Sequence, residues 1–286
     1  MFAAKIEISI MSQFLTAYVG ESLYNFYGFV CDGVYKDLED LQTSPKPAKY
    51  PANGVFDRTN TVWVGDVKYK DISGPDGVPD GVIDDYDKTN IGSPMPKFTF
   101  GWTNTFRYKN FDLSVFINGS YGNKVYNYLS MKLTHMNSPW TNQLNAVNGR
   151  AQLVPINPNK VYEDGTMWYN DVSNVMVANP GASIPRATIN DPNDNDRISD
   201  RYIEDGSYIR LKNISLGYTF PKKTIDKLGL SNLRIYANIQ NLLTITGYDG
   251  YDPEIGASTS SVNVYGLDNG RYPSPTVYSF GLNVSF

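Results

Sequence analysis

Cysteine and histidine are almost absent from this chain of 286 residues, which has one of each, Cys31 and His135. A single cysteine cannot form an internal disulfide, which excludes the class of small disulfide-stabilised secreted scaffolds. Zinc sites combine several cysteine, histidine or carboxylate ligands, and neither cysteine nor glutamate lies at ligand spacing from His135. We therefore predict that His135 is an ordinary loop residue.

An excess of basic residues is also missing. Lysine and arginine number 25 against 29 aspartates and glutamates, and no basic block could follow a phosphate backbone, which excludes nucleic acid as a partner. No apolar run approaches the ~18 residues of a membrane-spanning helix. Aromatic residues make up 14% of the chain and favour strands. Membrane-spanning strands are not excluded, because their alternating pattern cancels in an average of hydropathy.

Alternation of apolar and polar residues is the main signal that is present. The last nine residues, 278–286 (YSFGLNVSF), place bulky apolar side chains on one face and small polar ones on the other. The chain ends on the aromatic Phe286. This pattern is typical of the closing strand of a bacterial outer-membrane barrel, whose bulky residues face lipid and whose small polar residues face the lumen.

Patterns of this kind predict six strands in all, at 26–35, 98–108, 111–121, 208–220, 233–243 and 276–286. Residues 98–121 form the clearest hairpin. On the two faces we predict a lipid-facing set of Leu216, Ile235, Ile239, Phe280 and Leu282, and a lumen-facing set of Ser215, Asn238, Gln240 and Asn283.

The connections between these strands alternate in length. Residues 109–110 and 221–231 are short or intermediate, whereas 36–97, 122–207 and 247–275 are long and irregular, with a short helix within 126–136. Compact soluble domains rarely carry such long irregular loops, but outer-membrane barrels do. The fold class we predict is therefore all-β: an antiparallel transmembrane β-barrel meander of about six strands with long extracellular loops.

An acidic stretch at 71–87 resembles a calcium-binding loop, with Gly81 at its sharp turn. Counted from Asp76, the third position is valine and the twelfth is aspartate rather than glutamate, so the loop departs from the standard pattern. The ligands we predict are Asp71, Ser73, Asp76, Asp80, Asp84 and Asp87. The alternative is a tight acidic turn without an ion. A second oxygen-rich cluster, at 191–200, fits the template poorly and predicts a solvated turn.

Seven segments carry a resemblance to a known family. They are FYGFVCDGVY at 26–35, GDVKYKD at 65–71, GVIDDYDKTNIG at 81–92, PMPKFTFG at 94–101, DRYIEDGSYIRLKNISLGY at 200–218, NIQNLL at 238–243 and GYDPE at 250–254. Each segment alone is a weak signal, but the occurrence of all seven in the order that the family has is a specific one. With the terminal Phe286, the chain resembles the C-terminal part of the SusC/RagA-type TonB-dependent transporters of the Bacteroidetes outer membrane.

The resemblance implies a place in a larger protein. Such transporters have a signal peptide, an N-terminal plug, a TonB box and about 22 barrel strands, and we find no export signal at the start of this chain. Residues 1–286 would be a C-terminal barrel segment, with the plug domain and N-terminal barrel strands absent, and would not transport alone. The parent would be a protein of the cell outer membrane rather than an enzyme.

The resemblance also implies function and partners. The parent would import an oligosaccharide or peptide, with a SusD-like surface lipoprotein at its mouth and the TonB complex acting through the missing plug region. Planar rings suit sugar stacking, and the candidates are Trp140, Trp168, Tyr248 and Tyr251. We assign selectivity to the 122–207 loop, and a structural or partner-docking role to residues 251–254. Calcium is the one cofactor expected.

A rival interpretation is a secreted, calcium-assisted carbohydrate-binding β-sandwich. It accounts for the strands, the acidic loop and the aromatic residues. It does not account for an irregular stretch of more than eighty residues or for the aromatic terminus.

Overall fold

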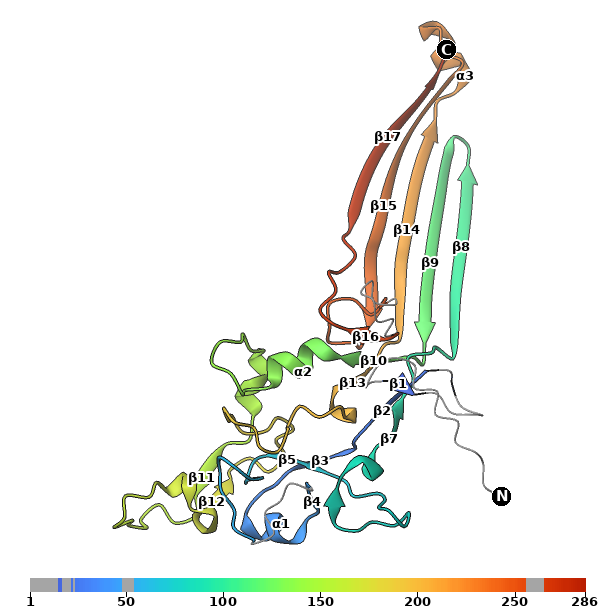
Figure 1. The fold of residues 1–286 in the computed structure, drawn as a ribbon. Helices are drawn as coiled ribbons and strands as arrows, with labels where there is room; N and C mark the ends of the chain where they lie inside the picture. The colour runs from blue at the N-terminus through green and yellow to red at the C-terminus, as the bar shows by residue number, and fades with distance from the viewer. Residues whose placement is uncertain (1–14, 17–21, 23, 48–53, 256–264) are drawn as a thin grey trace. The chain divides into compact units, whose positions relative to one another are not determined.

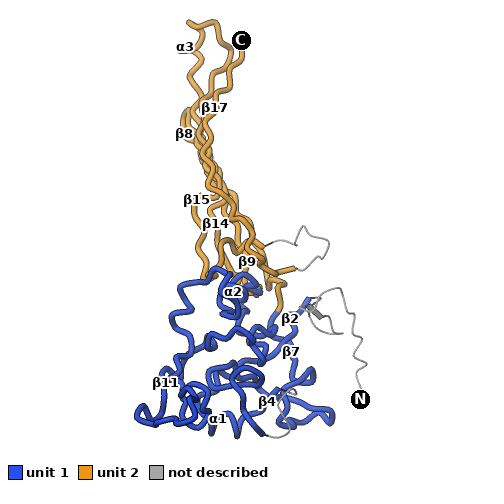
Figure 2. Tube along the Cα trace, turned by 60° about the vertical axis from the view of Figure 1, so that its left-hand side comes forward, with its two compact units in different colours: residues 1–92, 126–203, 260–264 blue, residues 93–125, 204–259, 265–286 orange. Residues whose placement is uncertain are grey.

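The computed structural model describes residues 15–16, 22, 24–47, 54–255 and 265–286. The start of the chain, where we find no export signal, lies outside the described residues. Two compact units, coloured separately in Figure 2, make up the chain. We call residues 93–125, 204–259 and 265–286 the sheet unit, and residues 1–92, 126–203 and 260–264 the loop unit. No helix in the described part of the chain is long and apolar enough to cross a membrane.

The sheet unit is built on five long strands: β8 (Phe98–Tyr108), β9 (Phe111–Tyr121), β14 (Tyr208–Thr219), β15 (Asn232–Thr246) and β17 (Val277–Ser285). They form one antiparallel sheet in the order β17-β15-β14-β9-β8, as Figure 1 shows. The two-residue turn between β8 and β9 confirms the predicted hairpin. Between β14 and β15 lie the short helices α3 (Lys222–Ile225) and η6 (Asp226–Leu228).

The register of this sheet confirms that the two predicted sets of residues lie on opposite faces. Residues paired across antiparallel strands project to the same side. Leu216 pairs with Leu113 and with Ala237, and Ala237 pairs with Phe280. The apolar face thus carries Leu216, Ile235, Ile239, Phe280 and Leu282, and the polar face carries Ser215, Asn238, Gln240 and Asn283.

A break in the alternation coincides with an irregularity in the sheet. The register of β14 shifts against both of its neighbours between Leu211 and Asn213. Opposite Lys212, β15 contributes two residues, of which Asn241 has a φ of +52°. Asparagine tolerates this left-handed conformation better than most residues. Beyond this one-residue bulge, Leu243 pairs with Leu211 and Leu211 pairs with Ile117, so Leu243 lies on the apolar face.

The predicted number of strands is wrong by one, because five long strands rather than about six occur in the described residues. The segment 26–35 is split into β2 (Asn25–Gly28) and β3 (Cys31–Val34), which pair in different sheets. Between them, the Phe29 N–H donates to the Ile198 carbonyl at 2.9 Å. A Cβ on Gly28 would lie 2.4 Å from the same carbonyl oxygen, so this close approach requires glycine.

The loop unit combines short strands and single helical turns. Its elements before the sheet unit are β1 (Leu15–Thr16), β2, β3, α1 (Leu38–Thr43), β4 (Lys46–Pro47), β5 (Val67–Tyr69), β6 (Val82–Ile83), η1 (Asp85–Asp87) and β7 (Thr89–Gly92). Those after β9 are β10 (Lys124–Asn127), α2 (Tyr128–Thr134), η2 (Asn145–Gly149), β11 (Leu153–Pro155), η3 (Trp168–Asn170), η4 (Val172–Asn174), β12 (Val175–Val177), η5 (Asp200–Tyr202) and β13 (Ile203–Asp205). The predicted helix within 126–136 is confirmed as α2. The chain passes between the two units within β10 and β13, and β16 (Leu267–Asp268) completes the order β13-β10-β16.

The loop unit has a hydrophobic core of its own. Trp63, Leu41 and Val175 are fully buried in it, and Val177 and Ala151 pack in the same cluster. These residues come from the stretches 36–97 and 122–207, which we expected to be long irregular loops. In the structure the two stretches pack against each other as one folded body.

Candidate functional site

A buried ion pair joins the two halves of the loop unit. The Asp66 carboxylate is fully buried, and the Arg186 guanidinium, 3% exposed, donates to it from Nε at 2.7 Å. The Trp63 N–H donates to the other carboxylate oxygen at 2.8 Å. Removing one member of such a pair leaves an uncompensated buried charge, which costs about 3–5 kcal/mol.

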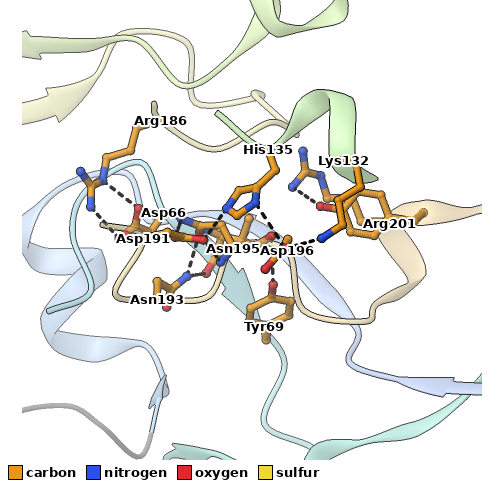
Figure 3. Close-up of polar contacts among 12 residues, drawn as sticks. Asp66, Tyr69, Lys132, His135, Arg186, Asp191, Asn193, Asn195, Asp196 and Arg201 are labelled. Atoms are coloured by element: carbon orange, nitrogen blue, oxygen red, sulfur yellow. Dashed lines mark hydrogen bonds and ion pairs between the residues drawn. The ribbon is translucent and has the colours of Figure 1, made fainter. Parts of the chain in front are cut away.

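Asn195 extends this contact into a network, drawn in Figure 3. Its amide nitrogen donates to Asp66 and to Asp191, and its amide oxygen accepts the Val67 N–H at 2.7 Å. The Asn195 backbone N–H also donates to Asp191, at 2.8 Å. Asp191 has a φ of +36°, a left-handed conformation that aspartate adopts more readily than most residues.

His135 closes the network between two carboxylates (Figure 3). Its Nε2 lies 2.6 Å from Asp191 and its Nδ1 lies 3.3 Å from Asp196, and the imidazole is 10% exposed. Burial lowers the pKa of His135, but the two carboxylates raise it by more than burial lowers it. The resulting pKa is about 9. The hydrogen bond from His135 lowers the pKa of Asp196. The imidazole is therefore a cation at neutral pH, which corrects the prediction that His135 is an ordinary loop residue.

The same three side chains form the one group within the described ranges whose metal-ligating atoms lie within 4.8 Å of one another. A metal would need a neutral imidazole nitrogen. Here both ring nitrogens already face carboxylates, and Lys132 places a further cation 3.5 Å from Asp196. The geometry therefore favours an imidazolium that fastens α2 to the 191–196 turn. The solvated turn predicted for this cluster is instead largely buried.

In the acidic loop, most carboxylates bind the backbone of the loop itself. Asp87 is buried and accepts N–H groups from Ile72 and Asp84, while Asp80 and Asp84 accept from residues two positions further on. Ser73 donates its N–H to Asp87 at 3.3 Å, and Asp76 is exposed. No three of these carboxylates, all within the described residues, lie as close together as the His135 group.

One carboxylate oxygen in this loop does not bind the backbone. Asp71 Oδ2 accepts the Gly81 N–H at 2.6 Å, whereas Oδ1 is buried and accepts no hydrogen bond from the described residues. Burial raises the pKa of Asp71, and the neighbouring Asp87 and Asp80 raise it further. Hard oxygen ligands of this kind suit calcium. Calcium binding by the loop stays a prediction.

A second ionic cluster fastens the 247–275 loop within the sheet unit. The Arg210 guanidinium, on the polar face of β14, binds Asp252 at 2.5 Å and Glu254 at 2.7 Å. Lys212 also binds Glu254, and the Ser274 N–H donates to Asp252 at 3.0 Å. Burial raises the pKa of Asp252, but the Ser274 N–H and Arg210 lower it more, so the net shift is downward. These contacts support the structural role predicted for residues 251–254.

Comparison with known proteins gives relatives over most of the chain. It is 32% identical to TonB-dependent receptor P3 of Formosa agariphila over 272 residues, covering 93% of this chain and 22% of that receptor. Receptor P26 of the same organism is 32% identical over 276 residues, covering 94% and 23%. TonB-dependent receptor SusC of Bacteroides thetaiotaomicron is 29% identical over 209 residues, covering 72% and 17%. No protein-family model matches the chain.

The fold is similar to that of solved RagAB structures. The RagAB peptide importer in its open-open state matches with a TM-score of 0.62 and 17% identity, over 100% of this chain and 25% of that one. The RagAB peptide transporter matches with a TM-score of 0.61 and 18% identity, over 96% and 24%. The chain is of the SusC/RagA type. It spans about a quarter or less of the length of these relatives.

The four predicted substrate residues of this SusC/RagA-type segment lie in different surroundings. Trp140 is 93% exposed and Tyr251 is 64% exposed. Trp168 packs against the hydrophobic core of the loop unit, and Tyr248 is buried with its hydroxyl donating to Asp268 at 2.6 Å. Trp140 and Trp168 belong to the loop unit and the two tyrosines to the sheet unit. Exposure therefore favours Trp140 and Tyr251 as binding residues.

The His135 network is the feature that the sequence analysis misses. The cluster at 191–200 shows residues suited to left-handed turns, and His135 is unique, but no spacing connects positions 56 residues apart. Asp66 and Arg186 are farther apart still, at 120 residues. Only packing of the two long stretches brings these groups together.

Proposed function

We propose that this chain forms part of the barrel and mouth of an outer-membrane TonB-dependent transporter that imports an oligosaccharide or a peptide. The observation that supports the proposal best is the continuous apolar face of the five-stranded sheet. On that face Phe280 is 84% exposed, Leu282 61% and Trp102 56%. A continuous surface of exposed aromatic and aliphatic side chains is typical of a protein face that contacts lipid rather than water.

Strand length supports the same arrangement. The five strands have 11, 11, 12, 15 and 9 residues in chain order. A tilted strand needs about 9–11 residues to cross the hydrocarbon core of a bilayer. The opposite face is polar and includes the Arg234–Asp112 pair at 2.6 Å, which suits a hydrated lumen.

The rival β-sandwich requires a second sheet packed on the apolar face, with side chains interdigitating at about 10 Å. Within the described residues, the apolar face of the sheet is exposed rather than covered. The transporter is therefore the better account.

The partners we propose follow from the relatives. SusC and the RagAB importer support a SusD-like surface lipoprotein at the mouth and energising by the TonB complex. RagAB is a peptide importer, and whether this chain serves a peptide or an oligosaccharide depends on the surfaces of its loop unit. We assign selectivity to the 122–207 stretch, which shares its core with residues 34–64.

The experiment that tests this function exchanges the loop unit between two complete transporters with different substrates. Because the two long stretches share one core, 24–92 and 126–203 are exchanged together. Uptake of labelled substrate by cells is expected to follow the exchanged unit, while exchange of 247–275 alone leaves preference unchanged. Preference that follows 247–275, or loss of all uptake by a correctly folded exchange variant, contradicts the proposal.

A further inference from the structure

A pocket of about 740 Å³ lies entirely within the loop unit. Three chain segments line it: 58–59, parts of 136–150, and 187–190. All of them belong to the two long stretches that carry no strand pattern. None of the lining residues is among the predicted calcium or substrate residues.

The His135 network holds this pocket in place. Two of the three lining segments adjoin it in sequence, because Met136 follows His135, Ala187 follows Arg186 and Asn190 precedes Asp191. Arg186 also donates from Nη2 to the Arg58 carbonyl at 3.2 Å. The Thr188 N–H donates to the Met136 carbonyl at 3.2 Å. A binding site needs such rigid support to keep its polar groups in position.

The charge of the lining is distinctive. The described residues that line the pocket include two arginines, Arg58 and Arg150, and no carboxylate, although the whole chain has a net charge of −4. The Arg58 guanidinium is fixed by Asn170, which accepts from Nε at 2.9 Å, and by stacking 5.0 Å from the centre of the Tyr169 ring. Guanidinium groups bind carboxylate and sulfate oxygens through paired hydrogen bonds.

The other polar groups of the lining suit a ligand with many hydroxyls. The side-chain amides come from Gln143, Asn148 and Asn190, and the hydroxyls come from the serine and threonine side chains of the lining. Trp140 follows the lining residue Pro139 and is 93% exposed, so its ring is open for stacking. Amides that donate and accept match the hydroxyls of a sugar, and an exposed planar ring matches its apolar face.

We propose that this pocket binds an oligosaccharide that carries carboxylate or sulfate groups. The inference rests on the proposed import function and narrows its substrate class. The two arginines bind the acidic groups, the amides bind hydroxyls, and Trp140 stacks on a ring at the rim. An acidic peptide shares the charge but lacks the hydroxyls that the amide-rich lining matches.

The test is titration calorimetry on the full chain in detergent, with four probes: a carboxylated tetrasaccharide (tetragalacturonate), a sulfated tetrasaccharide, a neutral tetrasaccharide and tetraglutamate. We expect a charged tetrasaccharide to bind, with affinity that falls as salt rises, and the neutral one to bind at least about tenfold more weakly. Arg150→Gln is expected to reduce affinity for the charged sugar by about tenfold or more. The matched control is Arg271→Gln, which removes an exposed arginine of the sheet unit and should change nothing.

Several results overturn the proposal. They are equal binding of neutral and charged sugars, an Arg150→Gln variant that binds as the parent does, or tighter binding of tetraglutamate, which assigns the pocket to acidic peptides. Emission from the buried Trp63 reports whether each variant is folded. A folded chain that binds no charged sugar also refutes the pocket assignment. That failure leaves the membrane arrangement untouched, because the titration involves no bilayer.

Discussion

At the scale of single residues, His135 matters most because it carries a charge inside the loop unit. Its pKa in the folded protein, about 9, lies above the ordinary value of 6.5. A raised pKa means that the protonated form stabilises the folded state. This contribution is fully present below about pH 6.5, declines as pH rises, and is lost above about pH 9.

Replacing His135 with glutamine therefore has a pH-dependent cost. We expect His135→Gln to lower the free energy of unfolding of the loop unit by about 2–3 kcal/mol at pH 6, because the ion pairs are lost, and by much less above pH 9. Urea unfolding followed by tryptophan emission measures it, since Trp63 is fully buried. Lys132→Gln, which removes a half-exposed cation near Asp196, is the control and should cost only about 0–1 kcal/mol. A cost for His135→Gln that is equal at both pH values would contradict the imidazolium assignment.

The acidic loop offers a second test at this scale. If calcium binds, Asp71 Oδ1, Asp80 and Asp87 supply oxygens, and the ion counteracts the burial and the carboxylate repulsion that raise the pKa of Asp71. Calorimetry with calcium should then give a binding signal that Asp71→Asn weakens strongly. Asp76→Asn tests whether this exposed member of the predicted calcium ligands also binds the ion. Absence of heat with the unmodified chain at millimolar calcium would leave the loop as a turn held by its own backbone contacts.

At the scale of elements, the 247–275 loop depends on Arg210. The guanidinium is 3% exposed and binds Asp252, Glu254 and the Thr244 hydroxyl. Arg210→Met leaves the buried Asp252 carboxylate without its cation, which costs about 3–5 kcal/mol. We expect hydrogen exchange at 248–255 to accelerate while the exchange of β9 stays slow. Arg210→Lys keeps the charge but not the fork of donors, and should give an intermediate rate. Unchanged exchange in the methionine variant would show that other contacts hold the loop.

Elements differ in how well the sequence predicts them, for a physical reason. The long strands, their faces and the hairpin at 98–121 follow from local alternation, which each strand carries in full. The core around Trp63 and Val175 joins residues more than a hundred positions apart. Its apolar residues follow neither a helical nor a strand period, so the sequence predicts only a loop. For the same reason the partners of His135 and the pocket near Arg150 emerge only when the stretches pack together.

At the scale of the whole molecule, the account rests on the different solvents that the two sheet faces meet. One face carries large apolar side chains that are more than half exposed, such as Phe280 and Leu282. The other carries ion pairs such as Arg234–Asp112. A barrel wall between lipid and a hydrated lumen explains both faces at once. Neighbouring residues of one strand should then differ in how much an added charge destabilises the protein.

The most direct measurement compares arginine at Leu282 and at Asn283 in the complete transporter, by its folding free energy into lipid bilayers. Both residues lie in the interior of β17 but on opposite faces. The account predicts that Leu282→Arg costs about 2–4 kcal/mol, because the charge enters the hydrocarbon, and that Asn283→Arg costs about 0–1 kcal/mol. Equal costs at the two positions, or a larger cost at Asn283, would contradict the claim that the apolar face of this sheet meets lipid.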